Sequence, residues 1–349
     1  MSGDMQNLLQ AYYVRAFPAK QGVRVSNLVS ITSTGWETDI YSFDVEHGPV
    51  GERKREELIL RIYPGDTDVL ARSKSAHEFY GMSQLHEAGY PVPQVLVLGR
   101  ENSPFGKPFV IMERIEGQML WPILFSSPQE KQQELLTLFC HLLVRLHTLE
   151  WRFFVDDVSK YDTGDPYALI DRELDRNRSI LTRFHIPGFM PVLEWLEVRR
   201  DEVPCLRPSP VHLDYHPNNV ILRDDGSAVV IDWTGFDVSD LRSDLAWTMA
   251  LVSSYEGAEW RQRILHEYER LARVKVKQIG YFEVAACLRR LHSVIVSLPH
   301  EQEGLISIRP AATAMMKQQM GAFERFYDLL VERTGIKVAE VERMLASFP

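Results

Sequence analysis

Residues 212–219 read HLDYHPNN, and residues 231–233 read IDW. Between these blocks, two β-prone runs, Val220–Arg223 and Ala228–Ile231, flank the turn sequence DDGS at residues 224–227. An Asp-Gly turn between two such runs predicts an antiparallel hairpin. Its two ends would lie together, with Asn219 directly before the first strand and Asp232 directly after the second. The pattern therefore predicts an amide oxygen and a carboxylate at one place.

A second carboxylate, Asp214, precedes Asn219 on a turn-prone segment. Carboxylate and amide oxygens suit a hard cation such as Mg²⁺, which keeps further positions for water and substrate phosphates. Phosphoryl transfer needs such a metal, and a separate carboxylate that orients the attacking hydroxyl and accepts its proton. Asp232 and Asn219 fit the metal role, and Asp214 fits the base.

Each of these residues also has a structural interpretation. Asp and Asn beside turns commonly serve as caps. His212 and His216 could ligate zinc, but neither has a partner at metal-ligand spacing. We therefore interpret His212 as a buried histidine that hydrogen-bonds the backbone. The joint pattern, and no single residue, favours the chemical interpretation.

The hydrophobic period changes along the 349 residues, a length at which two lobes are expected. Short β-type runs dominate the first third of the chain, and helical spacing dominates the rest. One helix, Val69–Ala88, is expected between the third and fourth runs. The predicted strands are Val25–Thr32, Thr38–Val45, Leu58–Tyr63, Gln94–Leu98 and Phe109–Glu113.

The second part of the chain is predicted to be a mainly helical lobe. Residues 127–130 read SPQE, which indicates a Ser127 N-cap, a proline at the first helical position and a capping-box Glu130. Leucines and a phenylalanine then recur at helical spacing as far as Leu149. Further helices are expected at Asp171–Leu181, Asp240–Tyr255, Glu259–Arg273, Tyr281–Leu298 and Ala311–Arg333.

Composition narrows the class of protein. Apolar residues make up 45% and charged residues 25%, a globular balance, and the net charge of -9 disfavours nucleic acid or an anionic membrane as partner. Cys140, Cys205 and Cys287 form no pair, as in a reducing compartment, and Cys140 and Cys287 lie in helical apolar patterns that predict buried thiols. Met1–Lys20 lacks the pattern of a signal peptide, and Ser293–Leu298 and similar apolar stretches are too short to span a bilayer. We expect a cytoplasmic protein.

Three blocks together resemble a known family: HLDYHPNN at 212–219, IDW at 231–233 and SDLRSDLA at 239–246. Their order and spacing are similar to the HGDxHxxN…IDW…GDxxxDLA signature of the aminoglycoside phosphotransferase and choline kinase-like family. The resemblance implies an α+β, two-lobed protein-kinase-like fold, with a β-rich nucleotide lobe at 1–116 and a helical lobe at 117–349. It also implies an ATP- and Mg²⁺-dependent kinase that transfers the γ-phosphoryl group to a hydroxyl of a small molecule.

The same resemblance implies roles for residues in the helical lobe. Asp214 would be the catalytic base, and His212 would support its loop. Asn219 and Asp232 would bind Mg²⁺. Asp240 and Asp244 look like structural residues that brace the loop.

In the first lobe the resemblance is weaker. Gly35 lies between the first two strands, where the family folds a loop over the phosphates. Arg61 lies where kinases usually carry a lysine, and it keeps the charge and adds a planar fork that can grip phosphate. Glu78 would be its ion-pair partner, although an ordinary surface pair is the alternative. Glu113 and Ile115 resemble the hinge whose backbone groups hydrogen-bond adenine.

The chain departs from the family pattern at three positions. Leu213 and Asn218 stand where the family often has glycine, and Ser239 replaces the glycine before Asp240. Glycine there usually relieves backbone strain, and Leu213 is the least expected replacement. None of the three removes a chemical group from the mechanism, so we do not interpret the chain as an inactive kinase.

The acceptor stays open, because the family acts on aminoglycosides, choline, homoserine, methylthioribose, macrolides and sugars. The acidic bias of Trp151–Glu202 would suit an amine-bearing acceptor, and solvated helix faces would look the same. ATP is expected, GTP is not distinguished from it, and the oligomeric state is open. The alternatives are a nucleotide-binding protein without phosphotransfer or one that transfers a nucleotide. A protein kinase is disfavoured because no DFG and APE pair frames an activation segment.

Overall fold

The computed structural model describes residues 2–31, 38–49, 51–63, 68–100, 103–161, 164–297 and 319–347. It has two compact units, Met1–Met119 with Val220–Phe236, and Leu120–Asn219 with Asp237–Pro349. The α+β, two-lobed, kinase-like architecture is confirmed. The hairpin groups with the N-terminal residues because its strands pair with Gln118–Met119. The lobe boundaries at 116 and 117 stay a prediction.

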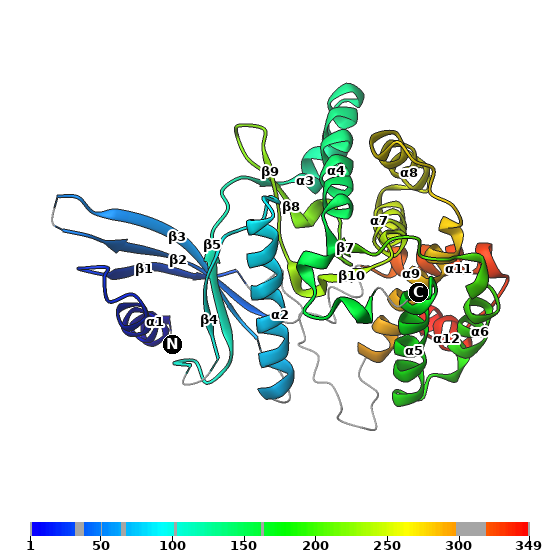
Figure 1. The fold of residues 1–349 in the computed structure, drawn as a ribbon, viewed down its shortest axis with the longest axis horizontal. Helices are drawn as coiled ribbons and strands as arrows, with labels where there is room; N and C mark the ends of the chain where they lie inside the picture. The colour runs from blue at the N-terminus through cyan, green and yellow to red at the C-terminus, as the bar shows by residue number, and fades with distance from the viewer. Residues whose placement is uncertain are drawn as a thin grey trace. The chain divides into compact units, whose positions relative to one another are not determined.

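The N-terminal unit is built on one antiparallel sheet with the order β1-β2-β3-β5-β4 (Figure 1). Each strand overlaps one of the five predicted runs. The observed bounds are β1 Arg24–Ser30, β2 Asp39–His47, β3 Lys54–Ile62, β4 Val95–Gly99 and β5 Phe109–Glu113. Helix α2, Asp68–Glu87, follows β3, as predicted.

Alternation along β3 separates the two faces of the sheet. Leu60 and Ile62 belong to a buried cluster that includes Leu9 and Tyr13 of α1, Ser2–Ala16. Arg61, between them, is directed to the opposite face and pairs with α2. The sequence analysis did not predict α1. It is tied to β1 by hydrogen bonds between glutamine side chains and the backbone of Val25.

The predicted hairpin is confirmed. Strand β8, Val220–Leu222, pairs with β9, Ala228–Val230, in a register that matches Val220 with Val230. Gly226 has a φ of 82°, a left-handed conformation that glycine adopts without steric cost. A short strand, β6 (Gln118–Met119), pairs with β8, and a single turn, η7 (Trp233–Gly235), follows the hairpin and packs against α2.

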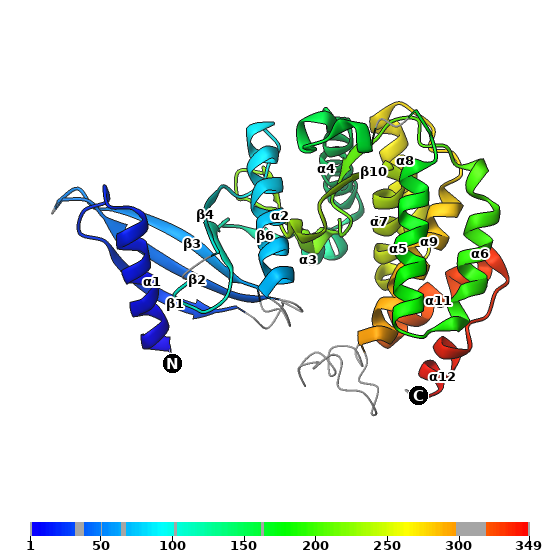
Figure 2. The same cartoon turned by 60° about the horizontal axis from the view of Figure 1, so that its bottom comes forward.

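The C-terminal unit is helical, and α7 and α9 pack along each other at its centre (Figure 2). Helices α6 and α11 pack against α9, and α8 packs against α7 and α4. The bounds are α3 Leu120–Ser126, α4 Gln129–Thr148, α5 Ala168–Arg183, α6 Met190–Val198, α7 Leu241–Glu256, α8 Glu259–Ala272, α9 Ile279–Ser297, α11 Met320–Thr334 and α12 Ala339–Ser347. Two short strands, β7 (Ser209–Val211) and β10 (Asp237–Ser239), pair antiparallel beside them.

One helix prediction needs correction, and another lies partly outside the described residues. The residue at the N-cap of α4 is Pro128, which has no side chain to accept a hydrogen bond. The Ser127 hydroxyl instead donates to Ile123 O of the preceding helix, so the predicted capping box is wrong. The helix predicted from Ala311 is described from Met320, and residues 311–318 lie outside the described part of the chain.

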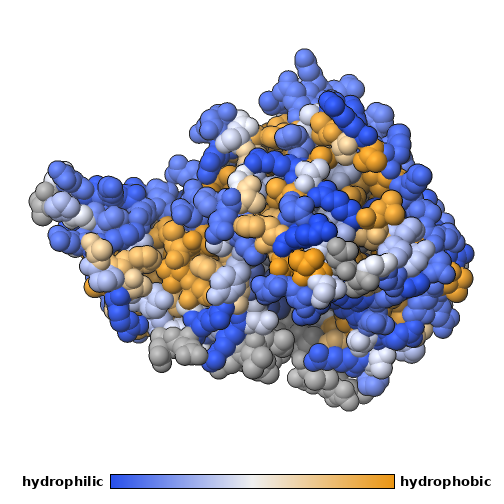
Figure 3. Space-filling view, viewed as in Figure 1, coloured by the Kyte–Doolittle hydropathy of each residue, from blue (hydrophilic) through white to orange (hydrophobic). Residues whose placement is uncertain are grey.

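The three cysteines are buried free thiols, as predicted for Cys140 and Cys287. Within the described residues, every helix is too short or too polar to cross a bilayer. Hydrophilic side chains cover most of the face in Figure 3, in keeping with the net charge of -9.

Candidate active site

The segment 212–219, here called the catalytic loop, follows β7 in the C-terminal unit. His212 is fully buried, and its Nδ1 accepts a hydrogen bond of 3.2 Å from the backbone N–H of Asp214. Leu213 has a φ of 59°, in the left-handed region. This value explains why glycine fits that position, since a side chain there is strained by about 1–3 kcal/mol. The side chain of His212 therefore fixes the backbone of the proposed base.

Asp244 on α7 braces this loop. Its two carboxylate oxygens accept from the backbone N–H groups of His212 at 2.7 Å and Leu213 at 2.9 Å. The ring of His147, on α4, lies 3.3 Å from the same carboxylate. Burial opposes the charge of Asp244, but His147 and His212 outweigh it and lower its pKa. Asp240 has a different task, because it caps α7 at the N–H of Arg242.

The carboxylate of Asp214 is held at the surface of the unit, with 44% of its side chain exposed. Its Oδ1 accepts a hydrogen bond of 3.0 Å from Trp247 Nε1, and its Oδ2 lies 3.7 Å from His216 Nε2. Packing around the group opposes its charge, but His216, His212 and Arg289 outweigh this and hold the pKa well below its ordinary value. Asp214 is therefore a charged carboxylate whose direction is fixed.

Asn219 is anchored through its amide nitrogen. Its Nδ2 donates to Asp214 O at 2.9 Å. Among the described residues none donates a hydrogen bond to its Oδ1, so the amide oxygen is available as a ligand.

In the N-terminal unit, Arg61 joins three elements through what is here called the Arg61 cluster, Thr38, Arg61, Glu78 and Asp232. It donates from Nη1 to Glu78 at 2.7 Å, from Nη2 to Asp232 Oδ1 at 2.8 Å and from Nε to Thr38 at 3.1 Å. The predicted Arg61–Glu78 ion pair is present, and it is buried. Glu78 also accepts from the hydroxyl of Tyr63. A lysine at position 61 would keep the charge, but it would lack the planar guanidinium that donates to three partners here.

Burial sets the electrostatics of this cluster. It opposes the charge of Arg61, but the carboxylates of Glu78 and Asp232 outweigh it, and the pKa of the guanidinium is raised. Burial also raises the pKa of Glu78, against the lowering effect of Arg61. Arg61 and Glu78 each need the other's charge, because either charge alone would be buried without a partner to compensate for the lost hydration.

Asp232 lies at the start of the η7 turn with a φ of 65° and 37% of its side chain exposed. Its Oδ1 accepts from Arg61 and from the hydroxyl of Thr234, at 3.2 Å. Within the described residues its Oδ2 takes part in no hydrogen bond. Asp232 thus keeps one carboxylate oxygen free, a ligand of the kind that Mg²⁺ prefers in proteins.

The remaining predicted nucleotide contacts are less well defined. Glu113 ends β5, and its N–H bonds to Gln94 O at 2.8 Å within the sheet, so that donor is not available to adenine. Its side chain accepts from Arg223 at 3.4 Å. Ile115 lies in the segment that follows, and its N–H has no partner in the described structure. Gly35 lies outside the described residues.

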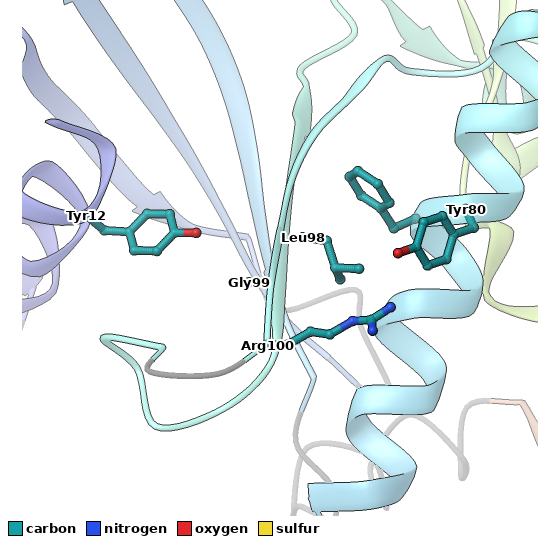
Figure 4. Close-up of a pocket in the computed structure, with 6 residues that line it drawn as sticks. Tyr12, Tyr80, Leu98, Gly99 and Arg100 are labelled. Carbon is teal, nitrogen blue, oxygen red and sulfur yellow. The ribbon is translucent and has the colours of Figure 1, made fainter. Parts of the chain in front are cut away.

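A shallow groove of about 430 Å³ lies elsewhere on the N-terminal unit (Figure 4). None of the predicted site residues lines it. Its lining is Tyr12, Phe79, Tyr80, Leu98, Gly99 and Arg100. In the described part of the chain no group of three or more His, Cys, Asp or Glu side chains is arranged to hold a metal.

Several contacts of the site were missed from the sequence, among them Thr38, Tyr63, His147, Thr234, Trp247 and Arg289. Trp247 directly follows the DLA block, three residues after Asp244, so the helical period could have placed it on the same face. Arg289 lies far along the chain on α9 and left no local signal.

Both units have the architecture of the protein-kinase-like phosphotransferases, with an antiparallel sheet and ion-paired helix in one and a loop carrying a charged Asp in the other. Similar structures include a protein of Ralstonia eutropha JMP134 assigned as an aminoglycoside phosphotransferase, at 16% identity and a TM-score of 0.62, covering 93% of this chain and 98% of that one. Another is a thermostable mutant of aminoglycoside phosphotransferase APH(4)-Ia bound to AMP-PNP and hygromycin B, at 16% identity and a TM-score of 0.54, covering 93% and 98%. These likenesses show the fold.

The sequence comparisons show the family. The profile of the phosphotransferase enzyme family (APH) matches residues 32–279, and the chain belongs to this family. Acyl-CoA dehydrogenase family member 10 of Mus musculus is 25% identical over 203 residues, which cover 55% of this chain and 18% of the mouse protein. The match thus spans less than a fifth of that relative's length.

Proposed function

We propose that the protein transfers the γ-phosphoryl group of ATP to a hydroxyl of a small molecule, with Asp214 as the base. One observation carries this proposal most directly. The Asp214 carboxylate is charged, nearly half exposed and fixed by Trp247, near the start of a loop anchored by Asp244. A carboxylate so held suits the orientation of an incoming hydroxyl.

The low pKa of Asp214 bears on how it would act. A weakly basic carboxylate takes up a proton late in the reaction, so its main contribution is to orient the hydroxyl for in-line attack. It would then accept the proton as the oxygen–phosphorus bond forms and ADP leaves.

Asn219 and Asp232 are our candidates for holding Mg²⁺, because each keeps an oxygen without a hydrogen-bond partner in the described structure. When bound, the metal would neutralise charge on the nucleotide phosphates. Arg61 keeps N–H groups beyond the three that it uses, and we propose that these bind phosphate. Ile115 offers its N–H to the adenine.

The acceptor is proposed only as a small molecule with a hydroxyl. The acidic segment that suggested an amine-bearing acceptor is largely engaged internally. Asp157 and Asp165 accept from nearby backbone N–H groups, Asp171 pairs with Arg200, and Glu173 accepts from a serine hydroxyl. An amine-bearing acceptor stays one of the candidates. Hygromycin B is the acceptor bound in the structurally similar APH(4)-Ia complex, and it belongs in the panel below.

A panel of hydroxyl acceptors with Mg²⁺ and ATP tests the proposal. We expect ATP consumption that depends on one acceptor class and falls at least about 100-fold in Asp214→Asn, since loss of a general base costs roughly 10²–10⁴-fold. Asp225→Asn, in the exposed turn of the hairpin, is the matched control and should keep full activity. Equal turnover by Asp214→Asn and Asp225→Asn would reject the role of Asp214.

A further inference from the structure

Two side chains of the helical core converge on Asp214 and its neighbour. Trp247, on α7, donates from Nε1 to Asp214 Oδ1 at 3.0 Å. Arg289, on α9, donates from Nη2 to Leu213 O at 2.5 Å. The guanidinium carbon of Arg289 also lies 3.7 Å from the centre of the Trp247 ring. One guanidinium therefore touches both the backbone of the loop and the ring that holds the carboxylate.

The strained residue before Asp214 is gripped at both of its peptide groups. The N–H of Leu213 bonds to Asp244 Oδ1, and its carbonyl accepts from Arg289. With a φ of 59°, leucine persists at this position only if its surroundings hold it. The Leu213 carbonyl belongs to the peptide unit that joins Leu213 to Asp214. The hydrogen bond from Arg289 therefore also fixes the position of the Asp214 backbone.

Arg289 is suited to this double contact. A planar guanidinium can lie flat on an indole ring while its edge donates to a carbonyl, and an ammonium group cannot do both. Burial lowers the pKa of Arg289, and the nearby carboxylates of Asp214, Glu173 and Asp244 counter that effect, while Arg176 adds to it. The group is thus a buried cation with three carboxylates in its neighbourhood.

We propose that Arg289 is a positioning residue for Asp214, acting on the backbone through Leu213 O and on the carboxylate through the Trp247 indole. The inference rests on the proposed function, in which Asp214 is the base. It predicts that a positive charge at position 289 is not sufficient to position Asp214, because the planar guanidinium makes both contacts.

The indole N–H signals of the protein provide a test that needs no acceptor. The seven tryptophans give seven such signals, and Trp247→Phe identifies one of them. Asp214→Asn should shift that signal, which confirms its hydrogen bond. We expect Arg289→Met and Arg289→Lys to shift it as well and to speed amide exchange in the catalytic loop. Arg290→Met, next on α9 and bonded to Gln319, is the matched control and should change neither.

With an acceptor in hand, both Arg289 variants should lose about 10–100-fold in kcat with the KM for ATP unchanged, as misplacement of a reacting group by about 1 Å can cost 100-fold. An unchanged Trp247 signal in Arg289→Lys, wild-type kcat in that variant, or equal effects of Arg290→Met would overturn the inference. Arg289→Lys keeps the buried charge and decides the question if Arg289→Met does not fold. A shifted signal together with full turnover by Asp214→Asn would instead overturn the proposed function.

Discussion

At the scale of single residues, two of the six non-glycine residues with positive φ in the described structure lie at the proposed site. Leu213 and Asp232 both have positive φ, and both adjoin or form the proposed site. Asp232 tolerates this conformation better than most residues, because a short polar side chain bonds locally. Leu213 has no such compensation and depends on Asp244 and Arg289.

Substitution of Leu213 tests this strain. Leu213→Gly should change the free energy of unfolding by less than about 1 kcal/mol, because relief of strain offsets the greater entropy of the unfolded chain. Leu213→Val should be at least about 1 kcal/mol less stable than the glycine variant, since a β-branched residue is a poor fit at positive φ. Urea unfolding of both variants provides the measurement. A valine variant as stable as the glycine variant would contradict the left-handed conformation of residue 213.

Arg61 is the second residue whose loss should be severe. Arg61→Met would leave Glu78 buried without its counter-charge, and breaking a buried pair costs about 3–5 kcal/mol. The matched control is Arg53→Met, which loses an exposed pair with Glu46 worth at most about 1 kcal/mol. Thermal or urea unfolding compares the two variants. Similar losses in both would show that the burial of Glu78 does not govern the cluster.

At the scale of elements, α2 and the η7 turn are packed without room between them. A Cβ at Gly81 of α2 would lie 2.7 Å from a ring carbon of Phe236, which follows the turn. Asp232 is the cap residue at the start of this turn. The packing at Gly81 therefore affects the position of the proposed metal ligand.

Gly81→Ala should therefore push the turn away from α2. We expect a destabilisation of about 1–3 kcal/mol from overpacking and a weaker affinity for Mg·ATP. Gly321→Ala, at a helical glycine where an added Cβ would meet only the end of the Arg325 side chain, at 3.7 Å, should have little effect on either quantity. Calorimetric titration with Mg·ATP and urea unfolding give both. Unchanged binding and stability in Gly81→Ala would contradict the close packing.

The contact between α5 and α9 contains a buried histidine. His292 is 4% exposed, and its Nε2 lies 3.1 Å from Asn177 Oδ1. Burial, reinforced by the charge of Arg289, lowers the pKa of His292 from 6.5 to about 4. Between these pH values the unfolded chain binds a proton that the folded protein does not. The folded protein should accordingly lose stability as the pH falls from about 6.5 to about 4.

The expected size is about 2 kcal/mol between pH 8 and pH 5. His292→Gln should remove this part of the pH dependence, while His86→Gln, at the exposed end of α2, should leave it in place. Urea unfolding at the two pH values measures the difference. Identical pH dependence in wild type and His292→Gln would show that His292 takes up its proton equally in both states.

At the scale of the whole molecule, the sequence predicted the elements better than their partners. Short stretches of sequence are enough to predict the strands and the Asp-Gly hairpin. The same is true of the blocks that carry Asp214, Asn219 and Asp232. The helix α1 was missed because its burial depends on the sheet that it covers. Arg289 was missed because only the packing of α9 on α7 brings it to the loop. The Ser127 cap failed because a competing carbonyl of the previous helix takes its hydroxyl.

The family and the fold are shown, so the central claim that needs a test is the proposed reaction, phosphoryl transfer with Asp214 as the base. The most direct measurement is ³¹P NMR of the reaction with Mg²⁺, ATP and the best acceptor, run for wild type and Asp214→Asn. The proposed function predicts ADP and a phosphomonoester of the acceptor in wild type, and neither above background in the variant. A phosphodiester with pyrophosphate would reveal nucleotide transfer, and an equal yield of monoester from Asp214→Asn would contradict the assignment of Asp214 as the base.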